Sequence, residues 1–124
     1  MGLVGHISYG KVGYLGNLMV QPEQRGIGAA LINEAMEHLL ISGVKSIRFD
    51  SVPKAISFYK HLEFKGESLS LRFTGETPKK GATRCMRMDE KDLPEVAELD
   101  LKLFEAPRAK VLRRVLNDFP QHYF

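Results

Sequence analysis

The residues best suited to chemistry form a glycine-rich turn, Arg25-Gly26-Ile27-Gly28-Ala29-Ala30, between an apolar run and an amphipathic pattern. Glycines relieve the Cβ constraint and let backbone N–H groups converge on an anion, and a helix that begins there adds its unpaired N–H groups and dipole. Arg25 brings a guanidinium that suits phosphate oxygens. The turn therefore predicts a pyrophosphate site, although a Gly-x-Gly turn before a helix also occurs without a ligand.

Composition narrows the class of protein. With 124 residues, 44% of them hydrophobic and 27% charged, the chain has the size and composition of one globular domain with its own core. A net charge of +3 favours a nucleotide-bearing cofactor but is too small to indicate nucleic-acid binding. No apolar run reaches the ~20 residues that cross a bilayer, so we expect no membrane role.

Cysteine and histidine usage argues against a disulfide framework and a metal site. The chain has one cysteine, Cys85, which favours a reducing, cytoplasmic location and a role as a small buried hydrophobe. His6 has no second histidine, cysteine or carboxylate at metal-binding spacing nearby. We therefore interpret His6 as a structural strand residue and expect no metal.

The turn is preceded by a hairpin pattern. Residues 3–9 and 12–20 read as antiparallel strands joined by Gly10-Lys11. Glycine weakens a strand interior, so Gly13 and Gly16 predict a bulge or a close backbone approach near Gly16.

The turn is followed by a helix and a strand. Leu31, Ala35 and Leu39 recur at helical spacing, and Gly43 suits the left-handed position that ends a helix. Residues 46–51 alternate as a strand, and the strand–helix–strand order favours a parallel pair.

Further elements are expected toward the C-terminus. Pro53 begins a helix that runs to Leu62, and Asp92 caps another. Alternation predicts strands over residues 68–73 and 83–88. A last helix covers residues 108–119, and its basic side chains read as a solvated face. These side chains are Arg108, Lys110, Arg113 and Arg114.

Two stretches together carry a family resemblance. The strand ends in Val20-Gln21-Pro22, the turn follows at Arg25, and the segment from Ala55 to Phe64 contains Tyr59. In order and spacing the chain resembles the GNAT superfamily of acetyl-CoA-dependent N-acetyltransferases. Family members carry Val-x-Pro, then Arg-Gly-x-Gly-x-Gly/Ala, then a tyrosine-bearing helix that ends in Gly-Phe. Glu63 stands where that glycine is usual.

The resemblance implies a fold and a cosubstrate. The fold is an α/β (α+β) mixed sheet whose strands splay apart at the cofactor site, and the cosubstrate is acetyl-CoA. Backbone groups bind the pantetheine arm in the splayed gap and the pyrophosphate at the turn. The residues implied are Leu18, Met19 and Val20 for the arm, and Arg25, Gly26, Ile27, Gly28, Ala29 and Ala30 for the pyrophosphate.

The resemblance also implies a reaction. A neutral primary amine attacks the thioester carbonyl directly, a backbone N–H near Met19 polarises the carbonyl oxygen, and Tyr59 is the general acid for the departing CoA thiolate. No metal is required. The acceptor is not identified, and no general base is assigned, although Asn17 and Glu23 stand near the expected cleft. A catalytically incomplete acyl-CoA-binding or assembly module is the alternative.

The order of the elements bears on domain organisation. We interpret residues 1–75 as the cofactor-binding core, 76–82 as a linker, and 83–124 as a strand–helix–helix segment that resembles the start of a further family domain. This order resembles the middle of a tandem two-domain acetyltransferase. The segment then docks on its own core or on a partner chain in a swapped homodimer. Alternatively, residues 83–88 are the ordinary last strand, paired with residues 68–73.

Overall fold

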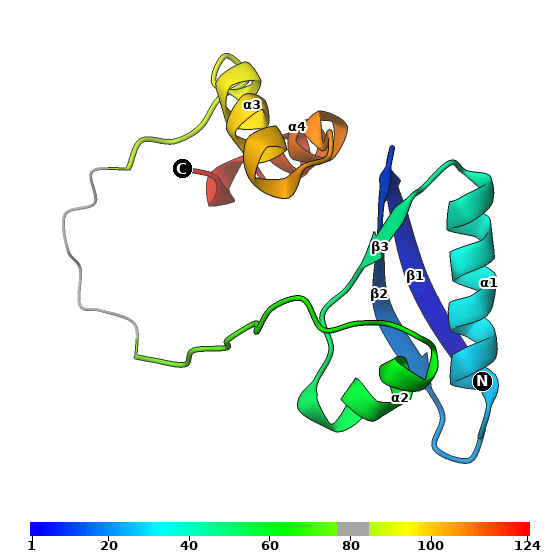
Figure 1. Cartoon of the computed structure of the whole chain (residues 1–124). Coiled ribbons are helices and arrows are strands. Elements are labelled where there is room, and N and C mark those ends of the chain that lie inside the picture. The colour runs from blue at the N-terminus through cyan, green and yellow to red at the C-terminus, as the bar shows by residue number, and fades with distance from the viewer. Residues whose placement is uncertain (77–84) are drawn as a thin grey trace. The chain divides into compact units, whose positions relative to one another are not determined.

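The computed structural model describes residues 1–76 and 85–124 (Figure 1). It contains two compact units, Met1–Leu71 (unit 1) and Arg72–Phe124 (unit 2), which are described separately. Most of the expected linker over residues 76–82 lies outside the described residues.

Unit 1 is built on a three-stranded mixed sheet with the order β1-β2-β3. β1 (Gly2–Tyr9) and β2 (Val12–Val20) form an antiparallel hairpin, and β3 (Ser46–Arg48) lies parallel to β2. Gly10, in the hairpin connection, has a φ of 75°, in the left-handed region that glycine adopts without strain. The predicted hairpin and parallel pair are confirmed.

One face of this sheet is covered by α1 (Ile27–Ile41), as Figure 1 shows. The core between them is apolar throughout, which is what the helical spacing predicted. Gly13 belongs to this face, because a Cβ there would lie 3.0 Å from Leu39 Cδ1 and 3.0 Å from Val44 Cγ1. The buried core residues are Leu15, Ile32, Ala35, Leu39 and Val44.

The end of α1 confirms the predicted role of Gly43. Its φ is 84°, its N–H donates to Leu40 O at 2.9 Å, and the N–H of Val44 donates to Leu39 O at 3.1 Å. This pair of bonds is a Schellman motif, which satisfies carbonyl groups at the end of the helix. The chain then turns directly toward β3.

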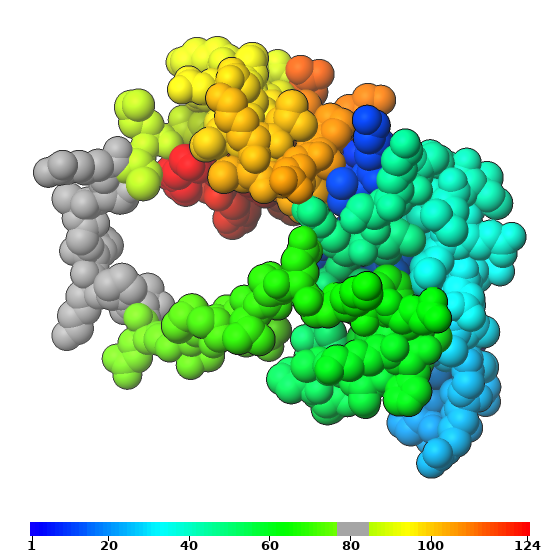
Figure 2. Space-filling view, in the orientation of Figure 1, coloured from blue at the N-terminus to red at the C-terminus, as the bar shows by residue number. Residues whose placement is uncertain are grey.

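The segment after β3 consists of two short helical elements. The sequence predicts one helix from Pro53 to Leu62, whereas the chain forms a 3₁₀ turn, η1 (Pro53–Ala55), followed by α2 (Ile56–His61). The side chains of Phe58, Tyr59 and Leu62 pack against the core on the α1 side. The space-filling view shows the α2 region packed against α1 (Figure 2).

One predicted strand is shorter than expected and another is absent. The strand expected over residues 46–51 ends at Arg48, and residues 68–73 form no strand. Leu69, Leu71 and Phe73 are 90%, 72% and 85% exposed. Alternation alone does not make a strand, because a strand needs a hydrogen-bonded neighbour.

The strand expected over residues 83–88 is not formed by its described part. Residues 83 and 84 lie outside the described residues, and residues 85–88 carry no regular secondary structure. Cys85 is therefore exposed, and the expectation of a buried cysteine is wrong.

Unit 2 contains the two helices expected near the C-terminus, α3 (Leu93–Phe104) and α4 (Ala109–Asp118), followed by a 3₁₀ turn, η2 (Pro120–His122). Leu93, Ala106 and Leu116 are its buried apolar residues. Among the described residues of both units, no helix is long and apolar enough to cross a membrane.

Two polar details of unit 2 differ from expectation. Asp92 precedes α3, but its carboxylate accepts the N–H of Asp89 at 2.9 Å and makes no capping bond to the helix. Arg108 is not part of a solvated face. Its Nε donates to Asp100 at 3.0 Å and its guanidinium lies 3.7 Å from the centre of the Phe104 ring.

Candidate functional site

The central feature of unit 1 is a gap where β2 separates from the chain that follows β3. β2 and β3 are paired only from the residue pair Val12 and Ser46 to the residue pair Tyr14 and Arg48. On the other side of β2, Leu3 pairs with Met19 but Gly5 pairs with Gly16, so β2 carries one extra residue. Asn17, within this bulge, has a φ of 55°. The predicted irregularity near Gly16 is confirmed, and a bulge bends its strand locally.

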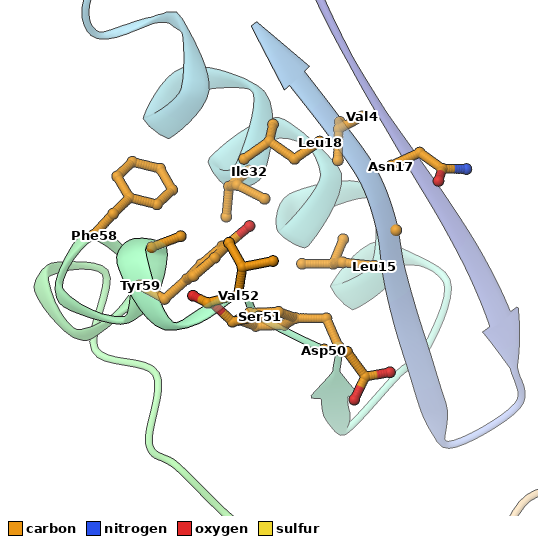
Figure 3. Close-up of a pocket in the computed structure, with 13 residues that line it drawn as sticks. Val4, Leu15, Asn17, Leu18, Ile32, Asp50, Ser51, Val52, Phe58 and Tyr59 are labelled. Carbon is orange, nitrogen blue, oxygen red and sulfur yellow. The ribbon is translucent and has the colours of Figure 1, made fainter. Parts of the chain in front are cut away.

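A cavity of ≈ 310 Å³ lies in this gap (Figure 3). Its walls come from β1, β2, α1, the segment after β3, and α2. The wall is largely apolar, as is usual for a site that holds a small organic group. Its polar side chains are those of Asn17, Asp50, Ser51 and Tyr59.

Tyr59 of α2 is positioned by aromatic contacts. Its ring centre lies 4.3 Å from that of Phe49, 5.0 Å from that of Phe58 and 6.3 Å from that of Phe64. Burial raises the pKa of the Tyr59 hydroxyl above its usual value, because the phenolate would lose hydration. The hydroxyl therefore stays protonated at neutral pH and is a proton donor.

The end of α2 fixes Phe64 against Tyr59. Glu63 has a φ of 66°, its N–H donates to Lys60 O at 3.1 Å, and the N–H of Phe64 donates to Tyr59 O at 3.1 Å. This is the same Schellman motif that ends α1, here with glutamate in the left-handed position. Glu63 keeps the helix-end geometry at a cost in backbone strain.

The backbone N–H and C=O groups of successive β2 residues point alternately toward β1 and toward the gap. The N–H of Gln21 donates to Met1 O at 3.0 Å, so Leu3 and Met19, two residues further along the ladder, are also a hydrogen-bonded pair. The N–H of Met19 therefore points to β1. The backbone groups of Val20, and of Leu18 next to the bulge, are the ones directed away from β1.

The glycine-rich turn forms the start of α1. Gly26 has a φ of 86°, which a residue with a Cβ rarely adopts. The N–H of Ala30 donates to Gly26 O at 3.3 Å. The N–H groups of Ile27, Gly28 and Ala29 have no acceptor among the described residues. They can bind an anion, which the helix dipole also favours.

Gly28 brings this turn next to α2 and the cavity. A Cβ on Gly28 would lie 3.6 Å from the Phe58 ring and 3.7 Å from Val20 Cγ2. Phe58 also lines the cavity beside Tyr59. The turn, the end of β2 and the tyrosine helix are thus neighbours, while the Arg25 side chain stays exposed at the turn.

Tyr14 and Asp50 form a hydrogen-bonded pair that sequence reasoning missed. The Tyr14 hydroxyl donates to Asp50 Oδ2, and burial together with this carboxylate raises the pKa of Tyr14 to about 12. Two signals were present in the sequence. Strand alternation places the Tyr14 side chain on the opposite face of the sheet from those of Gly13 and Leu15. Asp50 is an acidic residue in the stretch 46–51, where apolar and polar residues alternate.

The expectation that His6 has no second histidine nearby is corrected. The ring centres of His6 and His38 lie 4.9 Å apart, so a second histidine is close in space although distant in sequence. The described residues still contain no group of three or more metal-ligating side chains.

The mixed sheet with splayed strands, a glycine turn at a helix N-terminus and a tyrosine helix define an acyltransferase type of fold. The model of the acetyltransferase (GNAT) family matches residues 2–64. The chain therefore belongs to the GNAT acetyltransferase family, as the motifs indicated.

Solved structures give further likenesses. The chain is similar to an acetyltransferase of Trypanosoma brucei (31% identity, TM-score 0.47, covering 51% of this chain and 46% of that one). It is also similar to a GNAT-family protein of Xanthomonas campestris pv. campestris (28%, 0.46, covering 59% and 56%). A third is glucosamine-6-phosphate N-acetyltransferase of Arabidopsis thaliana (20%, 0.48, covering 54% and 47%). The chain spans about half the length of each. No curated protein matches it.

Proposed function

We propose that this chain transfers an acetyl group from acetyl-CoA to a primary amine, in a reducing compartment such as the cytoplasm. The observation that carries the proposal is the cavity between β2 and the segment after β3. It has a protonated Tyr59 in its wall and unpaired N–H groups of α1 beside it. Family membership supports the same chemistry.

The cosubstrate is held mainly by backbone groups. The N–H groups of Ile27, Gly28 and Ala29 bind the pyrophosphate, flanked by those of Gly26 and Ala30 and by the Arg25 guanidinium. The pantetheine arm lies along Leu18, Met19 and Val20, with Leu18 and Val20 presenting their polar backbone groups to it. No metal takes part.

The reaction is a direct displacement. The nitrogen of the neutral amine forms a bond to the thioester carbonyl carbon, and a backbone N–H of Leu18 or Val20 stabilises the oxyanion. The intermediate then breaks its C–S bond, and Tyr59 gives its proton to the sulfur that leaves with the electron pair. The amine loses its extra proton to solvent.

Thiol release from acetyl-CoA in the presence of an amine panel tests the proposal. We expect Tyr59→Phe to lower kcat about 100-fold or more, since general acid catalysis supplies roughly 10²–10⁴-fold, with acetyl-CoA affinity little changed. Tyr123→Phe, in unit 2, is the matched control and should keep full activity. Full activity of Tyr59→Phe excludes this tyrosine as the acid.

One observation favours the alternative, a catalytically incomplete acyl-CoA-binding or assembly module, because exposed apolar surface is typical of a face that contacts a partner. The sheet face opposite α1 exposes large apolar side chains in unit 1: Leu3, Ile7 and Met19 are 49%, 49% and 57% exposed. Acetyl-CoA binding without thiol release across the whole panel would support the module over the enzyme.

We further propose that residues 83–124 complete the domain, in the same chain or in a partner chain of a swapped homodimer, as the tandem-like order of elements suggests. Molar mass from light scattering after size exclusion distinguishes these arrangements. A dimer supports exchange between chains, and a monomer excludes it.

A further inference from the structure

Strand alternation places Tyr14 on the sheet face opposite α1. Gly13 faces α1, because a Cβ there would meet Leu39 and Val44, and Leu15 is part of the same core. Tyr14 lies between them in β2, so its side chain points to the other face. Since the Tyr14 hydroxyl donates to Asp50 Oδ2, the Asp50 carboxylate is reached from that face as well.

The cavity therefore has two different polar margins. Tyr59 packs with the core on the α1 side, whereas Asp50 stands where the chain leaves β3. Both residues line the cavity. Figure 3 shows the Asp50 carboxylate directed away from Tyr59. An acyl donor that enters beside α1 and α2 leaves the margin at Asp50 open to the second substrate.

The charges around Asp50 are favourable for a cation. Arg48 shares a face with Tyr14 through their pairing in the sheet, and its Nη2 lies 3.8 Å from Glu67 Oε1. Arg48, Glu67 and Asp50 together carry a net charge of −1. The other end of the gap has Arg25 and the positive end of α1. The two ends thus suit ligand groups of opposite charge.

We propose that Asp50, oriented by Tyr14, is a specificity-determining residue that binds the cationic group of the acceptor. This inference rests on the proposed acetyl transfer. It names the substrate class as amines that carry, apart from the reacting nitrogen, a second group that is cationic and not a carboxylate. A carboxylate that accepts one hydroxyl hydrogen bond keeps further lone pairs for an ammonium group. Tyr14 is a positioning residue, because it acts through Asp50.

Two acceptors of equal length separate charge from shape: 1,6-diaminohexane and 6-aminohexanoate. We expect the wild-type chain to favour the diamine about twofold to fivefold in kcat/KM, as exposed ion pairs allow. Asp50→Asn should abolish the preference by raising KM for the diamine, with kcat and acetyl-CoA affinity little changed. Glu34→Gln, which removes the same charge from the exposed side of α1, should keep it. An unchanged preference in Asp50→Asn overturns the proposal.

Tyr14→Phe tests the positioning role. It should weaken the diamine preference by about half while the chain stays folded, and KM should change more than kcat. An effect on kcat alone contradicts positioning through Asp50.

A second readout needs no turnover. In ¹⁵N-correlated NMR spectra, 1,6-diaminohexane should shift the amide signals of residues 48–52, and 6-aminohexanoate should not. The shifts should vanish in Asp50→Asn and persist in Glu34→Gln. No shift in the wild-type chain overturns the Asp50 site. By contrast, failure to bind acetyl-CoA or to release thiol counts against the proposed function, so the two failures are distinguishable.

Discussion

The two faces of the sheet in unit 1 are built differently. Toward α1, Leu15 and Leu39 are 3% and 0% exposed, and the aromatic cluster around Tyr59 extends this packing. On the opposite face, Leu3 and Ile7 are each 49% exposed, and Ile7 is paired in the sheet with Tyr14 of the Tyr14–Asp50 pair. The proposed acyl-donor side thus has a rigid core as its support. The proposed acceptor side has polar groups and exposed apolar surface.

The largest expected difference in stability is between two variants that each truncate one leucine, one on each face of the sheet. Leu39→Ala removes a fully buried side chain, so we expect it to lower the free energy of unfolding by about 3 kcal/mol. Leu3→Ala should cost less than about 1 kcal/mol. Urea denaturation measures both. Equal losses contradict the contrast, because they require Leu3 to be buried in solution.

A pair of glycines in β2 gives the next contrast. A Cβ on Gly13 would lie 3.0 Å from two side-chain atoms of the core, whereas one on Gly16 has nothing within 4 Å. We expect Gly13→Ala to destabilise unit 1 by about 1–2 kcal/mol through overpacking. Gly16→Ala should change stability by no more than about 0.5 kcal/mol. If the two variants denature at the same urea concentration, the close packing at Gly13 is refuted.

A smaller change, here a gain in stability, is expected from substituting Glu63 on the proposed acyl-donor side. Its left-handed φ of 66° is costly for glutamate and free for glycine, while glycine loses more backbone entropy on folding. Glu63→Gly should therefore raise the free energy of unfolding by about 0.5–1 kcal/mol. Glu63→Ala keeps the strain and serves as control. A loss of stability in the glycine variant argues against this conformation.

The last contrast is a pH dependence of stability at the acceptor side. Folding raises the pKa of Tyr14 from 10.0 to about 12, so the folded state holds this proton more tightly. The associated stability is complete below pH 10 and is lost as the pH rises from 10 to 12. Tyr14→Phe should flatten the decline in urea midpoint over this range. The burial of Tyr59 acts in the same direction and leaves a residual slope. An identical decline in both proteins contradicts the Tyr14–Asp50 hydrogen bond.

Features set by local chemistry were predictable from the sequence. The hairpin at Gly10 and the end of α1 at Gly43 follow from glycine conformations and were confirmed. The bulge near Gly16 was predicted because glycine weakens a strand interior, and it was also confirmed. Family membership followed from the spacing of the glycine turn and the tyrosine helix. The roles assigned to Tyr59 and to residues 18–20 and 25–30 stay predictions.

Features that depend on distant partners were not predictable. The early end of β3 reflects the splaying of β2, and residues 68–73 alternate without a strand to pair with. The Tyr14–Asp50 and His6–His38 contacts join residues far apart in sequence. Cys85 is exposed because the described residues around it form no strand. In each case tertiary contacts decided the outcome.

Thermal unfolding in the presence of acetyl-CoA tests the central claim most directly. A ligand that binds only the folded chain stabilises it by about 2.7 kcal/mol at 100 times its Kd, roughly 10 °C for a domain of this size. We predict such a rise for the wild-type chain and a smaller one for Arg25→Gln, which lacks the exposed guanidinium at the phosphate turn. No rise at saturating acetyl-CoA would contradict the proposed acyl-CoA site.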